Sequence, residues 1–214
     1  MPIKGLRAGW DPGFGGYAVD PEVKEVVSAA TRVFEELGCA VEETDFSLDS
    51  PSDTFWTLFC TALYAGYGRL LESKSDELTR YARESLEFGA SVSGADYAMA
   101  LGQMDHVKAL FANLFEQYDL LLSPTMAVTA FPVGEPPNEI GGREVDRFWG
   151  FNPFNFPINM IGNPAASIPC GFSSEGLPIG LHIVGRSRDE ATVIAASAAF
   201  EWARPWADHR PPVS

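Results

Sequence analysis

Serine and lysine are the residue types of this chain best suited to nucleophilic chemistry, and their surroundings predict no active site. Nucleophilic attack by a serine on a carbonyl group needs an activated hydroxyl and donors for the developing oxyanion. A lysine that serves as the base must lose its proton, which requires a site without water. The lysines, each beside polar or surface-facing neighbours, are Lys4, Lys24, Lys74 and Lys108. Ser173 and Ser174 lie between Gly and Pro residues without a preceding glycine run, which predicts a turn. We therefore expect no catalytic residue in this chain.

Histidine and cysteine are the residue types that would bind a metal, and neither forms a ligand pattern. His106, His182 and His209 are isolated, without a second ligand at metal spacing. Cys39, Cys60 and Cys170 are odd in number and lie among apolar neighbours, so we expect buried free thiols. We expect neither a metal nor another cofactor.

The residue types best suited to binding gather in one aromatic and amide-rich loop. Its members are Phe148, Trp149, Phe151, Asn152, Phe154, Asn155 and Phe156. Apolar surface with two amide side chains suits an uncharged or hydrophobic ligand. The alternative is that these aromatic residues seal the core against the helices, and both interpretations stay open. Thr125 and Met126 are further candidates, because they follow a predicted strand and ligands bind beyond the carboxyl ends of strands.

The composition is that of a globular protein. A chain of 214 residues, with 46% hydrophobic and 21% charged residues, fits a single domain over 1–214. The net charge of −14 argues against nucleic acid as a partner, because phosphate binding needs a basic patch. No apolar run approaches a membrane span and the first ten residues lack a signal segment. We expect no membrane association and a cytoplasmic location.

Five short strands must position the binding residues. They are predicted near residues 6–10, 39–43, 119–122, 165–169 and 179–184, where apolar runs are bounded by Gly, Pro or turn residues. Asp20 and Pro21 predict the start of a helix and Gly38 its end, which gives a βαβ unit. The glycine-rich stretch 11–16 fits no phosphate-binding spacing and predicts a plain turn.

Residues 51–117 predict a helical layer without strands. It contains a helix capped by Ser52 or Asp53, a helix over 76–88, and a helix that opens with the Ser93 and Asp96 capping box. Residues 126–147 predict a long loop, and a last helix begins in the segment after Gly185 and stops before the proline-containing tail 204–212. The fold class is α/β, a layered mixed or mostly parallel sheet flanked by helices.

The stretch from Phe148 to Gly185 resembles the C-terminal region of the amidase signature family, which are serine hydrolases that cleave C–N amide bonds. The matched residues, in order, are Asn159, Gly162, Pro164-Ala165, Ser167-Ile-Pro169, Gly176-Leu-Pro-Ile-Gly180 and Gly185. The run from Tyr118 to Thr125 is similar to a Tyr-Asp-x-Leu-x-x-Pro-Thr run of the same family. The resemblance extends from Leu6 to Pro212 but covers only about the C-terminal half of a typical member.

The resemblance implies a function that this chain cannot perform alone. Enzymes of the family use a Ser–Ser–Lys arrangement and a glycine-rich oxyanion loop, all in the N-terminal half of the family pattern. It therefore implies the C-terminal half of an amidase, inactive by itself, that binds an amide substrate only with the missing N-terminal half. The alternatives are a non-catalytic binding or assembly module and part of a glutamine-dependent amidotransferase A subunit.

The resemblance favours a general amidase over an amidotransferase A subunit. The A subunits hold the charged ends of glutamine with an Arg and an Asp, and the resemblance places Ser85 and Asn152 at those positions. Neither side chain can pair with a charged group in the same way. Half of a sheet should also expose strand edges and an apolar face, so we expect a homo-oligomer.

Overall fold

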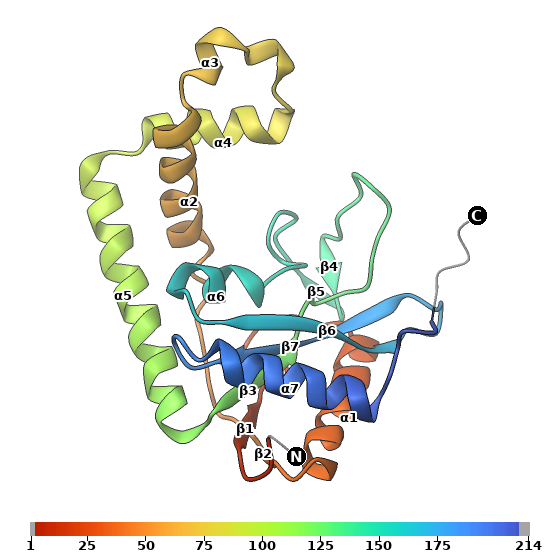
Figure 1. Cartoon of the computed structure of the whole chain (residues 1–214). Coiled ribbons are helices and arrows are strands. Elements are labelled where there is room, and N and C mark those ends of the chain that lie inside the picture. The colour runs from red at the N-terminus through yellow and green to blue at the C-terminus, as the bar shows by residue number, and fades with distance from the viewer. Residues whose placement is uncertain (1–2, 210–214) are drawn as a thin grey trace. The chain divides into compact units, whose positions relative to one another are not determined.

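The computed structural model describes residues 3–209, which divide into two units (Figure 1). The first falls within Met1–Asp49 and Phe111–Ser214, and the second spans Ser50–Leu110. The first unit holds a five-stranded sheet with helices, and the second is helical. That residues 1–214 form one domain stays a prediction.

The sheet of the first unit is mixed, as the sequence predicted. Its strands are β1 (Arg7–Trp10), β2 (Ala40–Glu43), β3 (Leu120–Pro124), β6 (Ala165–Phe172) and β7 (Pro178–Gly185), in the order β2-β1-β3-β7-β6. β1 pairs parallel with β2 and β3, whereas β7 pairs antiparallel with β3 and β6. All five predicted strands are present, and β6 and β7 are longer than predicted.

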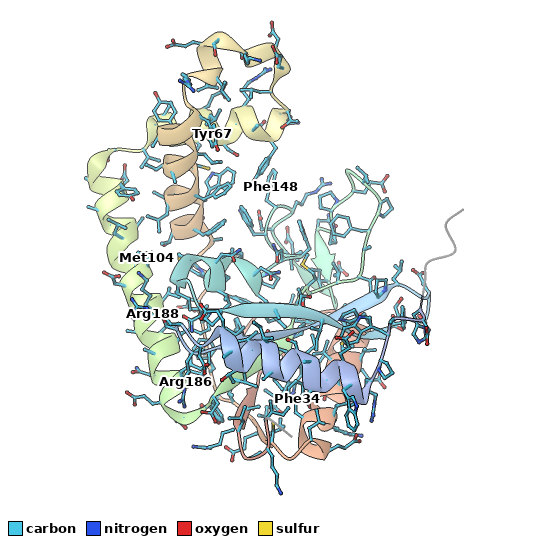
Figure 2. All side chains as sticks on the ribbon, in the orientation of Figure 1. Phe34, Tyr67, Met104, Phe148, Arg186 and Arg188 are labelled. Atoms are coloured by element: carbon cyan, nitrogen blue, oxygen red, sulfur yellow. The ribbon has the colours of Figure 1, made fainter. Side chains whose placement is uncertain are left out.

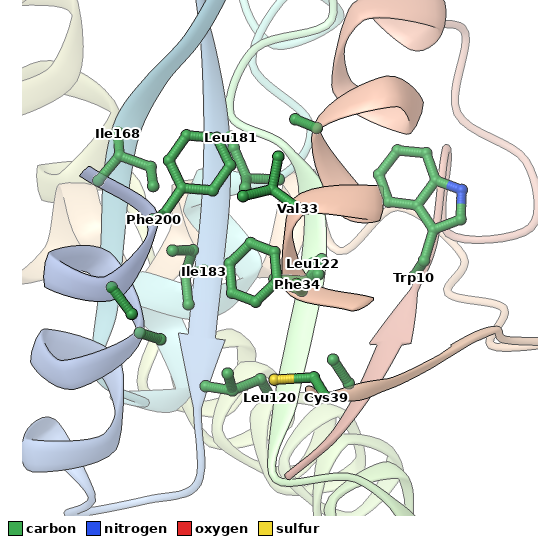
Figure 3. Close-up of a cluster of buried hydrophobic side chains, with 14 of the residues drawn as sticks. Trp10, Val33, Phe34, Cys39, Leu120, Leu122, Ile168, Leu181, Ile183 and Phe200 are labelled. Atoms are coloured by element: carbon green, nitrogen blue, oxygen red, sulfur yellow. The ribbon is translucent and has the colours of Figure 1, made fainter. Parts of the chain in front are cut away.

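Two helices cover one face of this sheet and enclose the main core. α1 (Pro21–Glu36) begins where the Asp20 carboxylate accepts hydrogen bonds from Glu22 and Val23, and α7 (Glu190–Ala203) begins after Asp189, which caps it in the same way. Figure 3 shows Phe34 of α1 and Phe200 of α7 among the side chains of β3, β6 and β7. Phe34 and Phe200 are 0% and 1% exposed, and burying each apolar side chain contributes about 1.5–3 kcal/mol.

The glycine-rich stretch after β1 is a turn, as predicted, and Asp11 holds it. One carboxylate oxygen of Asp11 accepts hydrogen bonds from the backbone of Gly13 and Phe14, and the other accepts one from Thr44 Oγ1 at 2.7 Å. Burial raises the pKa of Asp11, and these hydrogen bonds partly offset that rise. The turn places the buried ring of Phe14 against Phe46 and Phe154.

The second unit consists of α2 (Ser52–Tyr67), α3 (Leu70–Ser73), η1 (Ser75–Glu77), α4 (Arg80–Ser91) and the first part of α5 (Gly94–Gln117). The Ser93 and Asp96 capping box is present, with Ser93 Oγ 2.6 Å from the Asp96 carboxylate. The predicted helix start at Asp76 was wrong. Residues 75–77 form only a 3₁₀ turn, Leu78 is extended, and α4 begins after Thr79, whose hydroxyl accepts from the Ala82 amide.

Two further segments differ from the sequence predictions, and the last helix agrees with them. The aromatic and amide-rich loop ends earlier than predicted, because Asn155–Ile161 form α6. Pro157 fits there since first-turn amides need no helical acceptor. The predicted long loop 126–147 contains a hairpin of β4 (Glu139–Ile140) and β5 (Arg143–Glu144). α7 starts at Glu190 and ends before the tail, and the tail residues Arg210–Pro212 lie outside the described residues.

None of the helices formed by residues 3–209 combines the length and the apolar character needed to cross a membrane.

The crossing of α2 and α4 gives a test of the packing in the second unit. A Cβ atom at Gly89 would lie 2.1 Å from the Cys60 carbonyl oxygen, whereas a Cβ at Gly102 of α5 would meet nothing within 4 Å. We predict that Gly89→Ala lowers the free energy of unfolding by about 1–3 kcal/mol, because backbone cannot yield as a flexible side chain does. The matched variant Gly102→Ala should be neutral or stabilising by up to about 1 kcal/mol. Urea unfolding followed by circular dichroism measures both, and equal effects would contradict this packing.

Candidate functional site

The side-chain amide of Asn155 contacts three other residues that the sequence singled out. Asn155 is the first residue of α6, and its Nδ2 donates a hydrogen bond to the carbonyl oxygen of Thr125 at 2.9 Å. The same amide lies 3.5 Å from the sulfur of Met126 and donates to the side-chain oxygen of Asn152. The structure thus brings Thr125, Met126, Asn152 and Asn155 together just beyond the carboxyl end of β3.

A hydroxyl pair continues this group onto the neighbouring strands. Thr125 Oγ1 lies 2.8 Å from Ser167 Oγ of β6, and the Thr125 amide donates to the carbonyl of Gly180 on β7. A Cβ atom at Gly180 would lie 2.8 Å from both hydroxyl oxygens, so only glycine leaves room for the pair. Sequence reasoning used Ser167 and Gly180 only as family markers. The alternation of side chains along β6 is the signal that could have placed Ser167 beside Thr125.

The aromatic residues of the predicted site divide into two kinds. Phe154 and Phe156 are 0% and 2% exposed, and Phe154 packs against Phe14 with ring centres 5.0 Å apart. Trp149 and Phe151 are only half-buried. Trp149 lies edge-on to Phe156, and the Phe151 carbonyl accepts a hydrogen bond from Ala127. The two buried rings support the segment from beneath, and the two half-buried rings reach its surface.

Phe148, at the start of the predicted loop, is 63% exposed and is labelled in Figure 2 on the segment that precedes α6. The Asp146 carboxylate accepts hydrogen bonds from the amides of Phe148 and Trp149. This turn fixes the backbone of the loop while it leaves the Phe148 ring in solvent.

A polar cavity of about 300 Å³ lies beside the hydroxyl pair. It is lined by Asn155, Ile158, Asn159, Asn163, Ala165, Ala166, Ser167 and His182. His182 is 3% exposed, and its Nδ1 atom has no hydrogen-bond partner among the described residues. Burial lowers the pKa of His182 to about 4, so its ring is neutral near pH 7. With no charged side chain in its lining, the cavity suits an uncharged group that can form hydrogen bonds.

Among the described residues, no lysine is shielded from water, so none can act as a neutral base beside a hydroxyl group. Lys4, Lys24, Lys74 and Lys108 are all exposed, and Lys74 and Lys108 pair with Glu77 and Asp105. Ser173 and Ser174 occupy the turn between β6 and β7, as predicted, where Ser173 Oγ accepts a hydrogen bond from the Leu177 amide. The arrangement can therefore bind and orient an uncharged group, but it gives no lysine the environment that a base requires.

The remaining candidates are not among the residues of this group. Over residues 3–209, no three His, Cys, Asp or Glu side chains gather to hold a metal ion. The cysteines are free thiols, as predicted; Cys39 and Cys60 are buried and Cys170 is half-buried. Burial raises their pKa to about 11, 11 and 12. Ser85 is completely buried in α4, where its hydroxyl donates to the Tyr81 carbonyl.

Comparison with known families and proteins gives consistent matches along the chain. A family model described as Amidase matches residues 2–194. An acylamidase of Rhodococcus erythropolis is 35% identical over 215 residues, which cover 98% of this chain and 44% of that protein. The glutamyl-tRNA(Gln) amidotransferase A subunit of Thermosynechococcus vestitus is 32% identical, over 98% of this chain and 48% of that protein.

Solved structures show the same relation. A bacterial aryl acylamidase of the amidase signature enzymes superimposes with a TM-score of 0.83 at 28% identity, covering 98% of this chain and 47% of that one. The 6-aminohexanoate cyclic dimer hydrolase, solved with its substrate, gives a TM-score of 0.79 at 25% identity and covers the same shares. The chain thus spans about half the length of the relatives it matches.

The neutral His182 predicts a specific acid sensitivity. Its folded pKa of about 4 lies below the ordinary value of 6.5, so the unfolded chain binds a proton more readily. Its contribution to stability is complete above pH 6.5 and is lost as the pH falls toward 4. The free energy of unfolding falls by about 3 kcal/mol over that range. We predict that His182→Gln reduces the difference in free energy of unfolding between about pH 7.5 and pH 4.5.

The matched control for this experiment is His106→Gln, because His106 is exposed. Its pH dependence should follow that of the parent chain, since both retain His182 and the same acidic residues. Urea unfolding at the two pH values measures the difference. An unchanged pH dependence in His182→Gln would show that His182 is not buried in the neutral form.

Proposed function

This chain belongs to the amidase family, and we propose that it is the C-terminal part of an amidase-signature hydrolase that cleaves C–N amide bonds. The observation that carries the proposal is the match of the amidase model to residues 2–194, in a chain that covers only 44% of a related acylamidase. Nearly all of the chain thus fits the family, whereas about half of each relative has no counterpart in it.

We propose that the chain supplies one wall of the substrate pocket. Asn152, Asn155, Thr125 and Met126 would orient the amide, and Trp149 and Phe151 would contact its apolar part, with Phe154 and Phe156 in support. The hydrogen bonds from Asn155 support this proposal, because they hold the loop and the end of β3 in one fixed geometry. Since these side chains are uncharged, the preferred substrate is an uncharged aromatic or aliphatic amide.

The amide substrate would bind productively only with the missing N-terminal half, which would supply the nucleophile, the base and the oxyanion amides. The exposure of Lys4, Lys24, Lys74 and Lys108 supports this view. Acyl transfer from an amide needs both an activated nucleophile and preorganised donors for the oxyanion. The described residues of the pocket wall do not combine the two. A cytoplasmic location and the absence of nucleic-acid and membrane partners stay predictions.

An amidotransferase A subunit is the second candidate, because two of the related proteins, which are 32% and 34% identical to this chain, are such subunits. The neutral Asn152 at the binding loop favours the general amidase, since it cannot pair with a charged amino group. Glutaminase activity of the reconstituted full-length protein would favour the amidotransferase instead. A non-catalytic binding module predicts no turnover in any assembly.

The proposed function predicts that the purified chain hydrolyses no amide and that a chimera does. In the chimera, this chain replaces the C-terminal part of the Rhodococcus erythropolis acylamidase, which it matches at 35% identity. We expect no turnover of aromatic or aliphatic amides by the chain alone, and turnover above background by the chimera. Release of the amine product measures both.

The N-terminal part of the acylamidase alone is the matched control and should be inactive. Turnover by the isolated chain would overturn the claim that its residues lack a complete active site. A folded but inactive chimera would contradict the proposed contribution to an amidase and would favour the non-catalytic module.

Self-association of the isolated chain is a separate prediction that rests on the two open edges of the sheet. We expect a dimer or larger species by light scattering at tens of micromolar, roughly the range in which exposed edges associate. A monomer throughout that range would contradict it.

A further inference from the structure

A groove of about 460 Å³ lies between α1 and α7, beside the last residues of β6. It is lined by one side of α1, by residues 170–172 of β6, by Phe200 of α7 and by Arg204, which directly follows that helix. This α1–α7 groove shares no lining residue with the polar cavity or with the group around Asn155, so the proposed function does not account for it. We propose that the α1–α7 groove binds a small carboxylate with an apolar body.

Small residues keep the α1–α7 groove open. Ala29 and Ala30 lie on the side of α1 that lines it, and their methyl groups leave space that larger side chains would fill. Gly171 lets the end of β6 approach α1, because a Cβ atom there would lie 2.6 Å from Val26 Cγ1. The groove therefore follows from the residue sizes and the backbone positions of two regular elements.

The floor of the groove is apolar and uncharged. Val33 and Phe200 are buried members of the main core and are labelled in Figure 3. Cys170 is half-buried and its thiol donates to the Ile179 carbonyl oxygen at 3.4 Å; burial raises its pKa to about 12, so it stays neutral. Phe172, which is 43% exposed, adds an aromatic ring to the lining. This lining can remove the apolar body of a ligand from water.

Arg32 gives the same lining a positive charge that no carboxylate balances. Glu36 follows Arg32 by four residues on α1, a spacing at which the two side chains could pair. The Glu36 carboxylate instead bonds to the Arg204 guanidinium at 2.9 Å, and a second nitrogen of Arg204 donates to the Ala203 carbonyl. Among the described residues, no ion pair includes Arg32. Two guanidinium groups and one carboxylate leave the lining with a net charge of +1.

A carboxylate with an apolar body complements both features of the groove. Arginine binds a carboxylate through two parallel charge-assisted hydrogen bonds, and its fork loses little freedom in doing so. An uncharged apolar compound would leave Arg32 without a partner, whereas a small inorganic anion would leave the apolar floor in water. The volume falls within the range of about 300–1,000 Å³ that is usual for small-molecule sites.

The charge of the whole chain makes anion binding at this groove informative. The net charge is −14, and such a chain repels anions over most of its surface. An anion that binds must therefore find a local positive site, and Arg32 provides one next to an apolar floor.

Titration of the 214-residue chain with 4-phenylbutyrate tests the inference, with 4-phenylbutanol as an uncharged probe of similar shape. Backbone amide shifts in NMR spectra locate the binding site and give the Kd. We expect the largest shifts at residues 170–172 and along α1, and a Kd for the carboxylate about tenfold below that for the alcohol. Salt should weaken binding of the carboxylate and leave that of the alcohol unchanged.

Three variants separate the contribution of Arg32 from that of the groove itself. Arg32→Gln should weaken binding of 4-phenylbutyrate about tenfold or more and leave that of 4-phenylbutanol unchanged. Arg69→Gln, at an exposed arginine outside the groove, removes the same charge and should have no effect. Ala29→Phe fills the groove from the exposed side of α1 and should weaken binding of both probes. Thermal unfolding verifies that each variant is folded.

Four results would each overturn the inference: no shifts at the groove, equal affinity for the two probes, equal effects of Arg32→Gln and Arg69→Gln, or unchanged binding in Ala29→Phe. Because the experiment measures binding rather than turnover, its outcome is separate from that of the chimera. An inactive chimera together with Arg32-dependent binding would reject the proposed function and retain the groove as a carboxylate site.

Discussion

The pairing of β3 with strands on both sides is the constraint on which the first unit depends. Leu120, Leu121 and Leu122 are completely buried, and β3 pairs parallel with β1 and antiparallel with β7. It therefore joins the βαβ unit of the first fifty residues to the hairpin of the last fifty. Because Thr125 directly follows β3, the same pairing places the site: its amide donates to Gly180 and its hydroxyl meets Ser167.

The sequence predicted the elements well where one local signal dominated. Short apolar runs between Gly and Pro located all five strands, and the Asp20-Pro21 and Ser93-Asp96 patterns located two helix starts. It failed where local signals competed. Asp76 looks like a helix start, yet Leu78 is extended and Thr79 provides the cap. Likewise, Asn155 and Pro157 have low helix propensity, so the sequence did not predict α6. In the structure, Asn155 begins this helix and donates a hydrogen bond to Thr125.

The site shows the same division. Residue type and position beyond a strand were enough to choose Thr125, Met126, Asn152 and Asn155, which the structure brings together. Sealing of the core by the aromatic residues was one of two open interpretations, but the sequence could not show that Phe154 and Phe156 are the ones that do so, nor that His182 lies in the cavity. Both facts depend on which face of a strand or helix meets its neighbours, and that requires the strand register.

The strand order also has a consequence for synthesis on the ribosome. β3 is translated after residue 119, but β7, the strand that pairs with its second edge, emerges only with residues 178–185. During that interval the three leucines of β3 lack their antiparallel neighbour, and contacts so distant in sequence form slowly. These leucines therefore stay incompletely covered until β7 leaves the exit tunnel, and cool, slow expression should give more folded protein than rapid induction.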